Sequence, residues 1–254
     1  MIAHTEEVMG TVVSFLVDTE DLSDDQVARA IQRACEELHR LDNRFSTWKP
    51  ESELSRHRAG DGGTPSELMK EVIGLCETAR DLTKGFFDPW SLEGGFDPTG
   101  LVKGWAAERA LGILREEGVT AALVNAGGDV CVLPGQGYTV GIQHPLVREA
   151  FCAVVNTNSS VATSGVYERG DHLTHPFGGH VAAISATVVG GSLAMGDAWA
   201  TALAVAGKEV LYLLEGTEGI EGFFINSSGA MFSTSGMAGI TVDLAERLTG
   251  PTLP

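Results

Sequence analysis

The chain has 254 residues, of which 43% are hydrophobic and 20% charged, a balance typical of a globular protein with a substantial core. Its 17 basic and 34 acidic residues give a net charge of −17, which argues against a general nucleic-acid surface because phosphate backbones need a basic footprint. An anionic ligand would therefore be bound locally, by backbone N–H groups, a few cations or a metal ion.

The cysteines and residues 1–10 indicate in which cellular compartment the protein is expected. The 4 cysteines are widely spread without a CxxC pair, which favours free thiols in a reducing compartment and leaves two distant disulfides as the alternative. Residues 1–10 lack the basic and apolar regions of an export signal, and no run of ~18 apolar residues exists. We expect a cytoplasmic protein without a membrane span.

The first part of the chain predicts a strand and a helix. Residues 8–17 are β-branched and apolar and predict a strand. Ser23 and Gln26 have the spacing of a capping box and predict a helix that ends near Leu41. The polar segment 45–63 predicts a loop with a short helical turn.

Two further helices follow. A second capping box at 64–67, with proline at the first helical position, predicts a helix that ends near Lys84. Residues 85–100 are too rich in glycine and proline for a long element. Residues 103–118 predict a helix terminated by Gly118.

The second half predicts mainly strands, with one apolar helix at 192–207. The predicted strands are 121–127, 138–144, 152–156, 180–189, 222–226 and a segment around 231–234. Helices and strands are partly segregated, which favours an α+β fold over a doubly wound sheet. There is no internal repeat and no linker, so we expect one domain over residues 1–254.

One carboxylate interrupts the apolar helix at 192–207. Asp197 would need a basic partner, a backbone cap or a metal ion to offset its desolvation there. Thr201 lies one turn later on the same helix face, so the two oxygens have the spacing to ligate Mg²⁺. A local hydrogen bond between the two side chains is the simpler alternative.

Two other motifs have both a structural and a functional interpretation. Asp97 and Lys103 span a helix start, which is either an anion site or a helix start with a solvated lysine. Asn125-Ala126-Gly127-Gly128-Asp129 follows a predicted strand, where glycines permit close approach to a phosphate but more often form a tight turn.

Three histidines lie within residues 162–180: His172, His175 and His180. Because no HExxH pattern is present and glycines and proline interrupt the segment, one functional histidine is favoured over a zinc site.

Eight motifs occur in one order along the chain. They are MGT at 9–11, FSTWKPESELSR at 45–56, GFFDP at 85–89, DPTGLVKG at 97–104, NAGGD at 125–129, TSGVYER at 163–169, HLTHP at 172–176 and DAWAT at 197–201. In this order they resemble the ApbE family, the flavin transferases that move FMN from FAD onto a protein. The resemblance implies an α+β fold holding FAD in an extended cleft, with Mg²⁺ at the pyrophosphate. It also implies that a Thr or Ser hydroxyl of an acceptor flavoprotein attacks the FMN phosphorus and AMP leaves.

The resemblance assigns roles to individual residues. It implies Asp197 and Thr201 as Mg²⁺ ligands, with the carbonyl of Gly100 as a third. It implies His172 as the base for the hydroxyl, with Asp97 or a metal-bound hydroxyl as the alternative. The residues expected at the cofactor are Met9, Trp48, Lys103, Asn125, Gly127, Gly128, Asp129, Ser164 and Gly165, of which Lys103 also counts as catalytic.

Two other functions remain compatible with the sequence. One is a FAD pyrophosphatase, which uses water as the acceptor and forms FMN and AMP. The other is a flavin-binding or delivery protein without turnover, an idea motivated by the short segment between Pro89 and Asp97.

Overall fold

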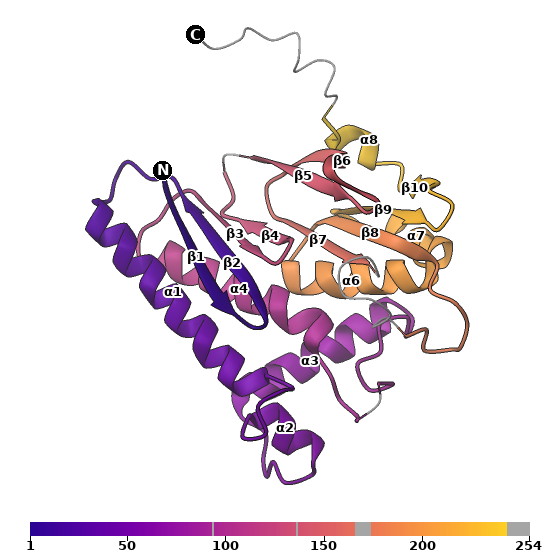
Figure 1. Cartoon of the computed structure of the whole chain (residues 1–254), viewed down its shortest axis with the longest axis horizontal. Helices are drawn as coiled ribbons and strands as arrows, with labels where there is room; N and C mark the ends of the chain where they lie inside the picture. The colour runs from indigo at the N-terminus through magenta and orange to yellow at the C-terminus, as the bar shows by residue number, and fades with distance from the viewer. Residues whose placement is uncertain (93, 136, 166–173, 243–254) are drawn as a thin grey trace, which may run out of the picture.

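The computed structural model describes residues 1–92, 94–135, 137–165 and 174–242 (Figure 1). Its large sheet is antiparallel throughout and has the strand order β1-β2-β3-β4-β7-β8-β9-β10. These strands are β1 (Ile2–Val8), β2 (Thr11–Val17), β3 (Ala122–Ala126), β4 (Asp129–Val132), β7 (Ser160–Gly165), β8 (Ala183–Gly190), β9 (Ile220–Asn226) and β10 (Met231–Ser233). A separate antiparallel pair contains β5 (Tyr138–His144) and β6 (Val147–Thr157).

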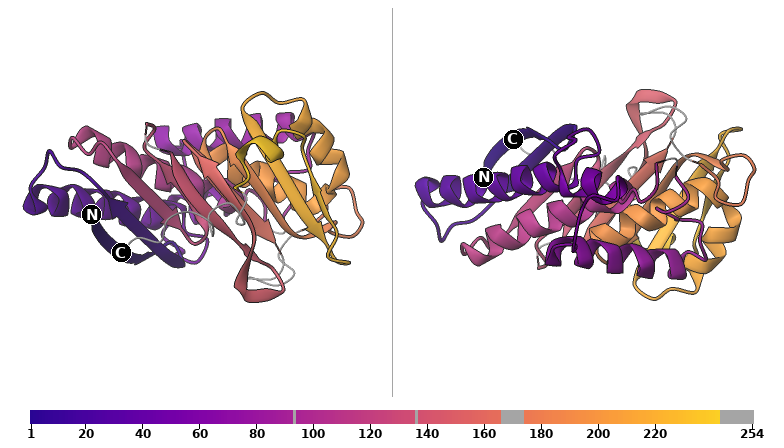
Figure 2. Two further views of the ribbon diagram at one scale, coloured as in Figure 1. Left: turned by 90° about the horizontal axis from the view of Figure 1, so that it is seen from above. Right: turned by 90° about the horizontal axis from the view of Figure 1, so that it is seen from below.

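Most helices cover one face of the large sheet, whereas the β5–β6 pair, together with the short helix at 237–240, lies on the other (Figure 2). The helices are α1 (Asp24–Phe45), α2 (Glu53–Arg58), α3 (Glu67–Leu82), α4 (Thr99–Glu116), α6 (Leu193–Ala206), α7 (Lys208–Glu215) and α8 (Met237–Ile240). Because strand side chains alternate between faces, neighbouring residues of β9 enter two cores. Phe224 packs with the helices, whereas Phe223 packs with residues of β5 and β6. The α+β prediction is confirmed.

The strand predicted at 8–17 corresponds to β2 (Thr11–Val17), preceded by the turn and the last residue of β1, so the prediction missed that β1 and β2 form a hairpin. Met9 and Gly10 form its turn, and both have a positive φ, of 56° and 69°. This backbone suits a two-residue turn between twisted strands. The first strand, β1, is polar at most positions and lies at the sheet edge, so its sequence lacks the apolar pattern that marks β2.

The helix starts follow side-chain caps. In α1 the Gln26 side chain accepts a hydrogen bond from the Ser23 backbone N–H at 3.0 Å, as the capping-box pattern predicts. In α3 the predicted cap at 64–67 is wrong by two residues. Ser66 is the cap, because its hydroxyl accepts from Met69 N–H and its own N–H donates to Glu53 of α2.

Other elements differ in extent. The helix α4 begins four residues before its predicted start, and Gly118 follows its end with a φ of 90°. The sequence patterns did not predict β7, α7 or α8. Across the described ranges, no helix is both long enough and apolar enough to cross a bilayer.

Candidate functional site

A cavity lies where the start of α4, the end of β7 and one face of α6 meet the segment 86–92. Eight of the predicted site residues line it: Asp97, Gly100, Lys103, Gly127, Ser164, Gly165, Asp197 and Thr201. They come from positions about a hundred residues apart, so the tertiary fold and not one local motif assembles this site.

The helix α6 places Asp197 in the wall of this cavity. Asp197 is only 4% exposed, and Thr201 lies one turn later and also lines the cavity. The Thr201 hydroxyl forms a hydrogen bond with the Ser164 hydroxyl of β7, at 3.0 Å. The helix thus presents a carboxylate and a hydroxyl on one side, and the strand adds a second hydroxyl beside them.

Small residues hold α6 tightly against α4. A methyl group at Gly104 would lie 2.7 Å from the Leu193 carbonyl oxygen, so only glycine permits this approach of the two backbones. The Glu108 carboxylate of α4 accepts hydrogen bonds from the N–H groups of Leu193 and Ala194, at 2.6 and 3.3 Å. These bonds cap the start of α6 and fix the helix that carries Asp197.

Burial dominates the ionisation of Glu108. It raises the pKa of this carboxyl above its ordinary value of 4.5, although the two backbone N–H groups act in the opposite direction. Glu108 contributes to the position of α6, and it does not line the cavity.

Gly100 lies at a break in the first turn of α4. Its φ of −78° and ψ of 16° are not helical, which turns its carbonyl away from the direction taken in a regular helix. A methyl group there would lie 3.4 Å from the Thr201 hydroxyl and 3.2 Å from the Phe87 ring. Glycine therefore leaves room beside Thr201 at the cavity wall.

Lys103 extends from the next turn of α4 and forms an ion pair with Asp129. Asp129 is fully buried, and its other oxygen accepts from Thr163 N–H at 2.9 Å. The carboxylate therefore connects β4, β7 and α4 and holds the lysine at the cavity wall. The sequence left open whether Lys103 is a solvated lysine at a helix start, and the ion pair with Asp129 shows that this interpretation is wrong.

Asp97 is engaged at the start of α4. One oxygen accepts from Thr99 N–H at 3.0 Å, and the other lies 3.5 Å from the Arg58 guanidinium. The carboxylate thereby fixes the first turn of α4 and also lines the cavity.

The NAGGD motif forms the turn between β3 and β4. The Asn125 side chain accepts from Gly128 N–H at 2.8 Å, and both glycines have a positive φ. A methyl group at Gly127 would clash with the Thr11 hydroxyl of β2. The turn interpretation is confirmed, and Gly127 also lines the cavity. Asn125 and Gly128 instead line a neighbouring pocket beside β5 and β6.

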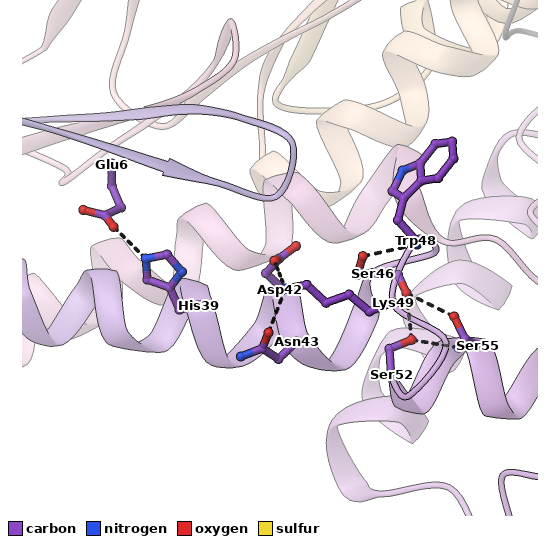
Figure 3. A network of polar contacts seen from close by, with 9 residues as sticks. All are labelled: Glu6, His39, Asp42, Asn43, Ser46, Trp48, Lys49, Ser52 and Ser55. Carbon is purple, nitrogen blue, oxygen red and sulfur yellow. Dashed lines mark hydrogen bonds and ion pairs between the residues drawn. The ribbon is translucent and has the colours of Figure 1, made fainter.

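Two further predicted residues, Met9 and Trp48, lie elsewhere in the fold. Met9 is in the β1–β2 turn, and Trp48 is 91% exposed after the end of α1 (Figure 3). Neither residue lines the cavity. His172, the predicted base, lies outside the described residues, as do 166–171 and Leu173.

The sequence analysis assigned no role to the aromatic part of the wall. Phe86 and Phe87 line the cavity, and Phe86 also packs edge-to-face on His175 at 5.8 Å and on Phe177 at 5.3 Å. The GFFDP motif could have indicated this wall, because two adjacent aromatic residues in a segment without regular structure are expected to pack against a neighbouring surface.

The fold and the cavity define an α+β protein with a cleft between the start of α4, one face of α6 and the end of strand β7. Two solved structures share this fold. One is the ApbE protein of Thermotoga maritima, with a TM-score of 0.84 at 21% identity, covering 95% of this chain and 99% of that chain. The other is the flavin transferase ApbE of Vibrio cholerae, with a TM-score of 0.78 at 18% identity, covering 94% and 98%.

The chain belongs to the ApbE family, whose family model matches residues 9–93 and 92–224. A FAD:protein FMN transferase of Salmonella typhimurium is 30% identical over 149 residues, which is 52% of this chain and 43% of that protein. The Escherichia coli K12 protein of the same name is 31% identical over the same length, covering 52% and 42%. The matched region thus spans less than half the length of these curated relatives.

Proposed function

We propose that this protein is a Mg²⁺-dependent FAD:protein FMN transferase that attaches FMN to a Thr or Ser hydroxyl of an acceptor protein and releases AMP. The observation that carries the proposal is the assembly of Gly100, Lys103, Asp197 and Thr201 around one cavity in a member of the ApbE family. Relatives with the name FAD:protein FMN transferase support the same reaction.

The donor set fits a magnesium ion. Asp197 offers a carboxylate, Thr201 a hydroxyl and Gly100 a backbone carbonyl, and all three are the oxygen ligands that Mg²⁺ prefers. The absence of a Cβ at Gly100 keeps the space beside Thr201 open. Bound Mg²⁺ would neutralise charge on the pyrophosphate oxygens.

The chain's own residues would bind and orient FAD. Lys103, held by Asp129, supplies a fixed cation at the cavity wall, which suits a phosphate. Phe86 and Phe87 supply an apolar wall that excludes water from one side. Because Asp88, Asp97 and Asp197 also line the cavity, a metal ion would be needed beside Lys103 to offset the charge of a pyrophosphate.

The reaction forms one bond and breaks one. The acceptor hydroxyl oxygen bonds to the FMN phosphorus, the bond from that phosphorus to the AMP oxygen breaks, and the hydroxyl proton passes to a base. We assign the base to His172, with Asp97 as the alternative. The cofactor roles of Met9 and Trp48, the single domain and the cytoplasmic location stay predictions from the sequence.

The test is incubation of the protein with FAD, Mg²⁺ and an acceptor protein. We expect AMP release together with an acceptor whose mass increases by one FMN group. Asp197→Asn should lose both signals, whereas Asp25→Asn, on the exposed start of α1, should keep them.

Each failure has a distinct meaning. Equal amounts of FMN and AMP without any labelled acceptor would replace the transferase by a pyrophosphatase. Tight FAD binding that is independent of metal, without AMP, would replace it by a flavin-binding protein.

A further inference from the structure

A groove lies between the edge strand β1 and helix α1, remote in the fold from the cavity described above. Alternate residues of β1 face the helix, so His4 and Glu6 share the side that meets α1. On α1, Cys35 and His39 lie four residues apart and therefore on one face. All four side chains line the groove.

The other three side chains lie around Glu6. One Glu6 oxygen lies 2.6 Å from His39 Nε2, a bond that spans from β1 to α1 (Figure 3). The other oxygen lies 3.3 Å from His4 Nε2. The donor atoms of His4, Glu6 and Cys35 all lie within 4.8 Å of one another.

The distances among these three donors approach those of a metal centre, and His39 adjoins them through its bond to Glu6. Ligand atoms around a tetrahedral zinc ion are roughly 3.3–3.8 Å apart, given metal–ligand bonds of about 2.0–2.3 Å. Rotation of the two imidazoles would bring the donor atoms closer together, and both rings lie at the rim of the groove, where His4 and His39 are 42% and 48% exposed. Cys35, only 7% exposed, lies at the bottom of the groove.

The donor chemistry selects the class of ion. Two imidazole nitrogens, one sulfur and one carboxylate are ligands for Zn²⁺, whereas Mg²⁺ prefers oxygen donors only. We propose that His4, Glu6, Cys35 and His39 form a zinc site that fastens the β1–β2 hairpin to α1. Binding replaces the Cys35 thiol proton, which passes to solvent, and one Zn²⁺ joins the strand to the helix.

This site does not depend on the proposed flavin transfer. It uses none of the cavity residues, and its assay needs no FAD. Its effect would be on the stability of the hairpin, because β1 is an edge strand that pairs with only one neighbour, β2.

Cobalt serves as a spectroscopic probe of the groove. The full chain, freed of metal and of any histidine tag, is titrated with Co²⁺ alone, and we expect a thiolate-to-cobalt absorption band that saturates at one equivalent. Cys35→Ser should abolish the band, whereas Cys152→Ser, a half-buried thiol of β6, should keep it. A band that persists in Cys35→Ser, or none in the wild type, would overturn the proposal.

Because Cys35 is buried, exposed ligands give a second test. Zn²⁺ should raise the thermal unfolding midpoint of the wild type, and His39→Gln should weaken the apparent affinity at least about tenfold. His144→Gln, in the β5–β6 pair, is the matched histidine control. An equal Zn²⁺-induced rise of the unfolding midpoint in His39→Gln would contradict the site. Loss of that rise in Asp197→Asn would also contradict it, because it would assign the ion to the cavity.

Discussion

The cavity at α4 and α6 and the groove between β1 and α1 are built in different ways. In the cavity, oxygen donors lie on two closely packed helices, with Asp197 almost fully buried. In the groove, nitrogen and sulfur donors lie on an edge strand and a helix, and most of them are half exposed. The backbone holds the first set in place, whereas the second set is held by side-chain contacts to Glu6.

The cavity and the groove should respond differently to substitutions and to ion binding. Packing at Gly104 and capping by Glu108 fix α6, so the cavity depends on residues that never touch a ligand. The histidines of the groove are half exposed and held only by Glu6, so a bound ion would fix their positions. The two donor sets also separate the ions, with Mg²⁺ expected at one and Zn²⁺ at the other.

The largest effect should come from the carboxylate of the cavity. Asp197→Asn removes a charge and keeps the size of the side chain, so the fold should persist. We expect kcat/KM for FMN transfer to fall at least about 100-fold, or ~2.7 kcal/mol of transition-state stabilisation. Steady-state AMP release at several Mg²⁺ concentrations measures this, and an unchanged kcat/KM would show that the cavity is not the reaction site.

The close approach of α4 and α6 can be tested with two glycines of one helix. Gly104→Ala would push a methyl group against the Leu193 carbonyl and should cost about 1–3 kcal/mol of unfolding free energy. Gly112→Ala has open space around it and should gain up to about 1 kcal/mol from helix propensity. Urea unfolding measures both, and similar values for the two variants would contradict the packing argument.

The cap on α6 should have a smaller effect. Glu108→Ala leaves the N–H groups of Leu193 and Ala194 without their acceptor and should cost about 1–2 kcal/mol. Glu116→Ala, exposed on the same helix, should change stability by less than about 0.5 kcal/mol. Equal unfolding midpoints in urea for the two variants would show that Glu108 does not stabilise the start of α6.

The ionisation of Glu108 gives a test in pH. Because burial raises its pKa in the folded state, its contribution to stability is fully present below pH 4.5 and is lost as the pH rises through the folded pKa. Glu108→Gln cannot ionise, so its unfolding free energy should fall less than that of the wild type between pH 4.5 and neutral pH. Parallel curves for the two proteins would show that this carboxyl does not titrate differently on folding.

The smallest effect on stability should come from Trp48, which lies in neither region. Trp48→Ala removes a side chain that is 91% exposed and should change the unfolding free energy by less than about 0.5 kcal/mol. If Trp48 lines the flavin or adenine pocket, as the family resemblance implies, the variant should raise KM for FAD with kcat little changed. An unchanged KM would remove Trp48 from the flavin pocket.

The sequence predicts those features that have a local cause. The capping box at Ser23 and the small apolar residues around Asp197 identify α1 and α6, because both patterns lie within a few turns. The α+β class follows from the same local patterns. The order of the family motifs also indicates which distant residues share the cavity.

Features with a tertiary cause were not predictable. The cap of α3 is Ser66 and not Thr64, because Glu53 of another helix binds the Ser66 N–H. The ion pair of Lys103 depends on a turn 26 residues later. The groove between β1 and α1 joins residues 33 positions apart that show no common motif.

A structure of the protein with FAD and Mg²⁺ tests the central claim most directly. We predict that the pyrophosphate of FAD lies beside Lys103 and that oxygens of Gly100, Asp197 and Thr201 hold Mg²⁺. A pyrophosphate in the pocket beside β5 and β6, with Asp197 remote from any ion, would contradict it.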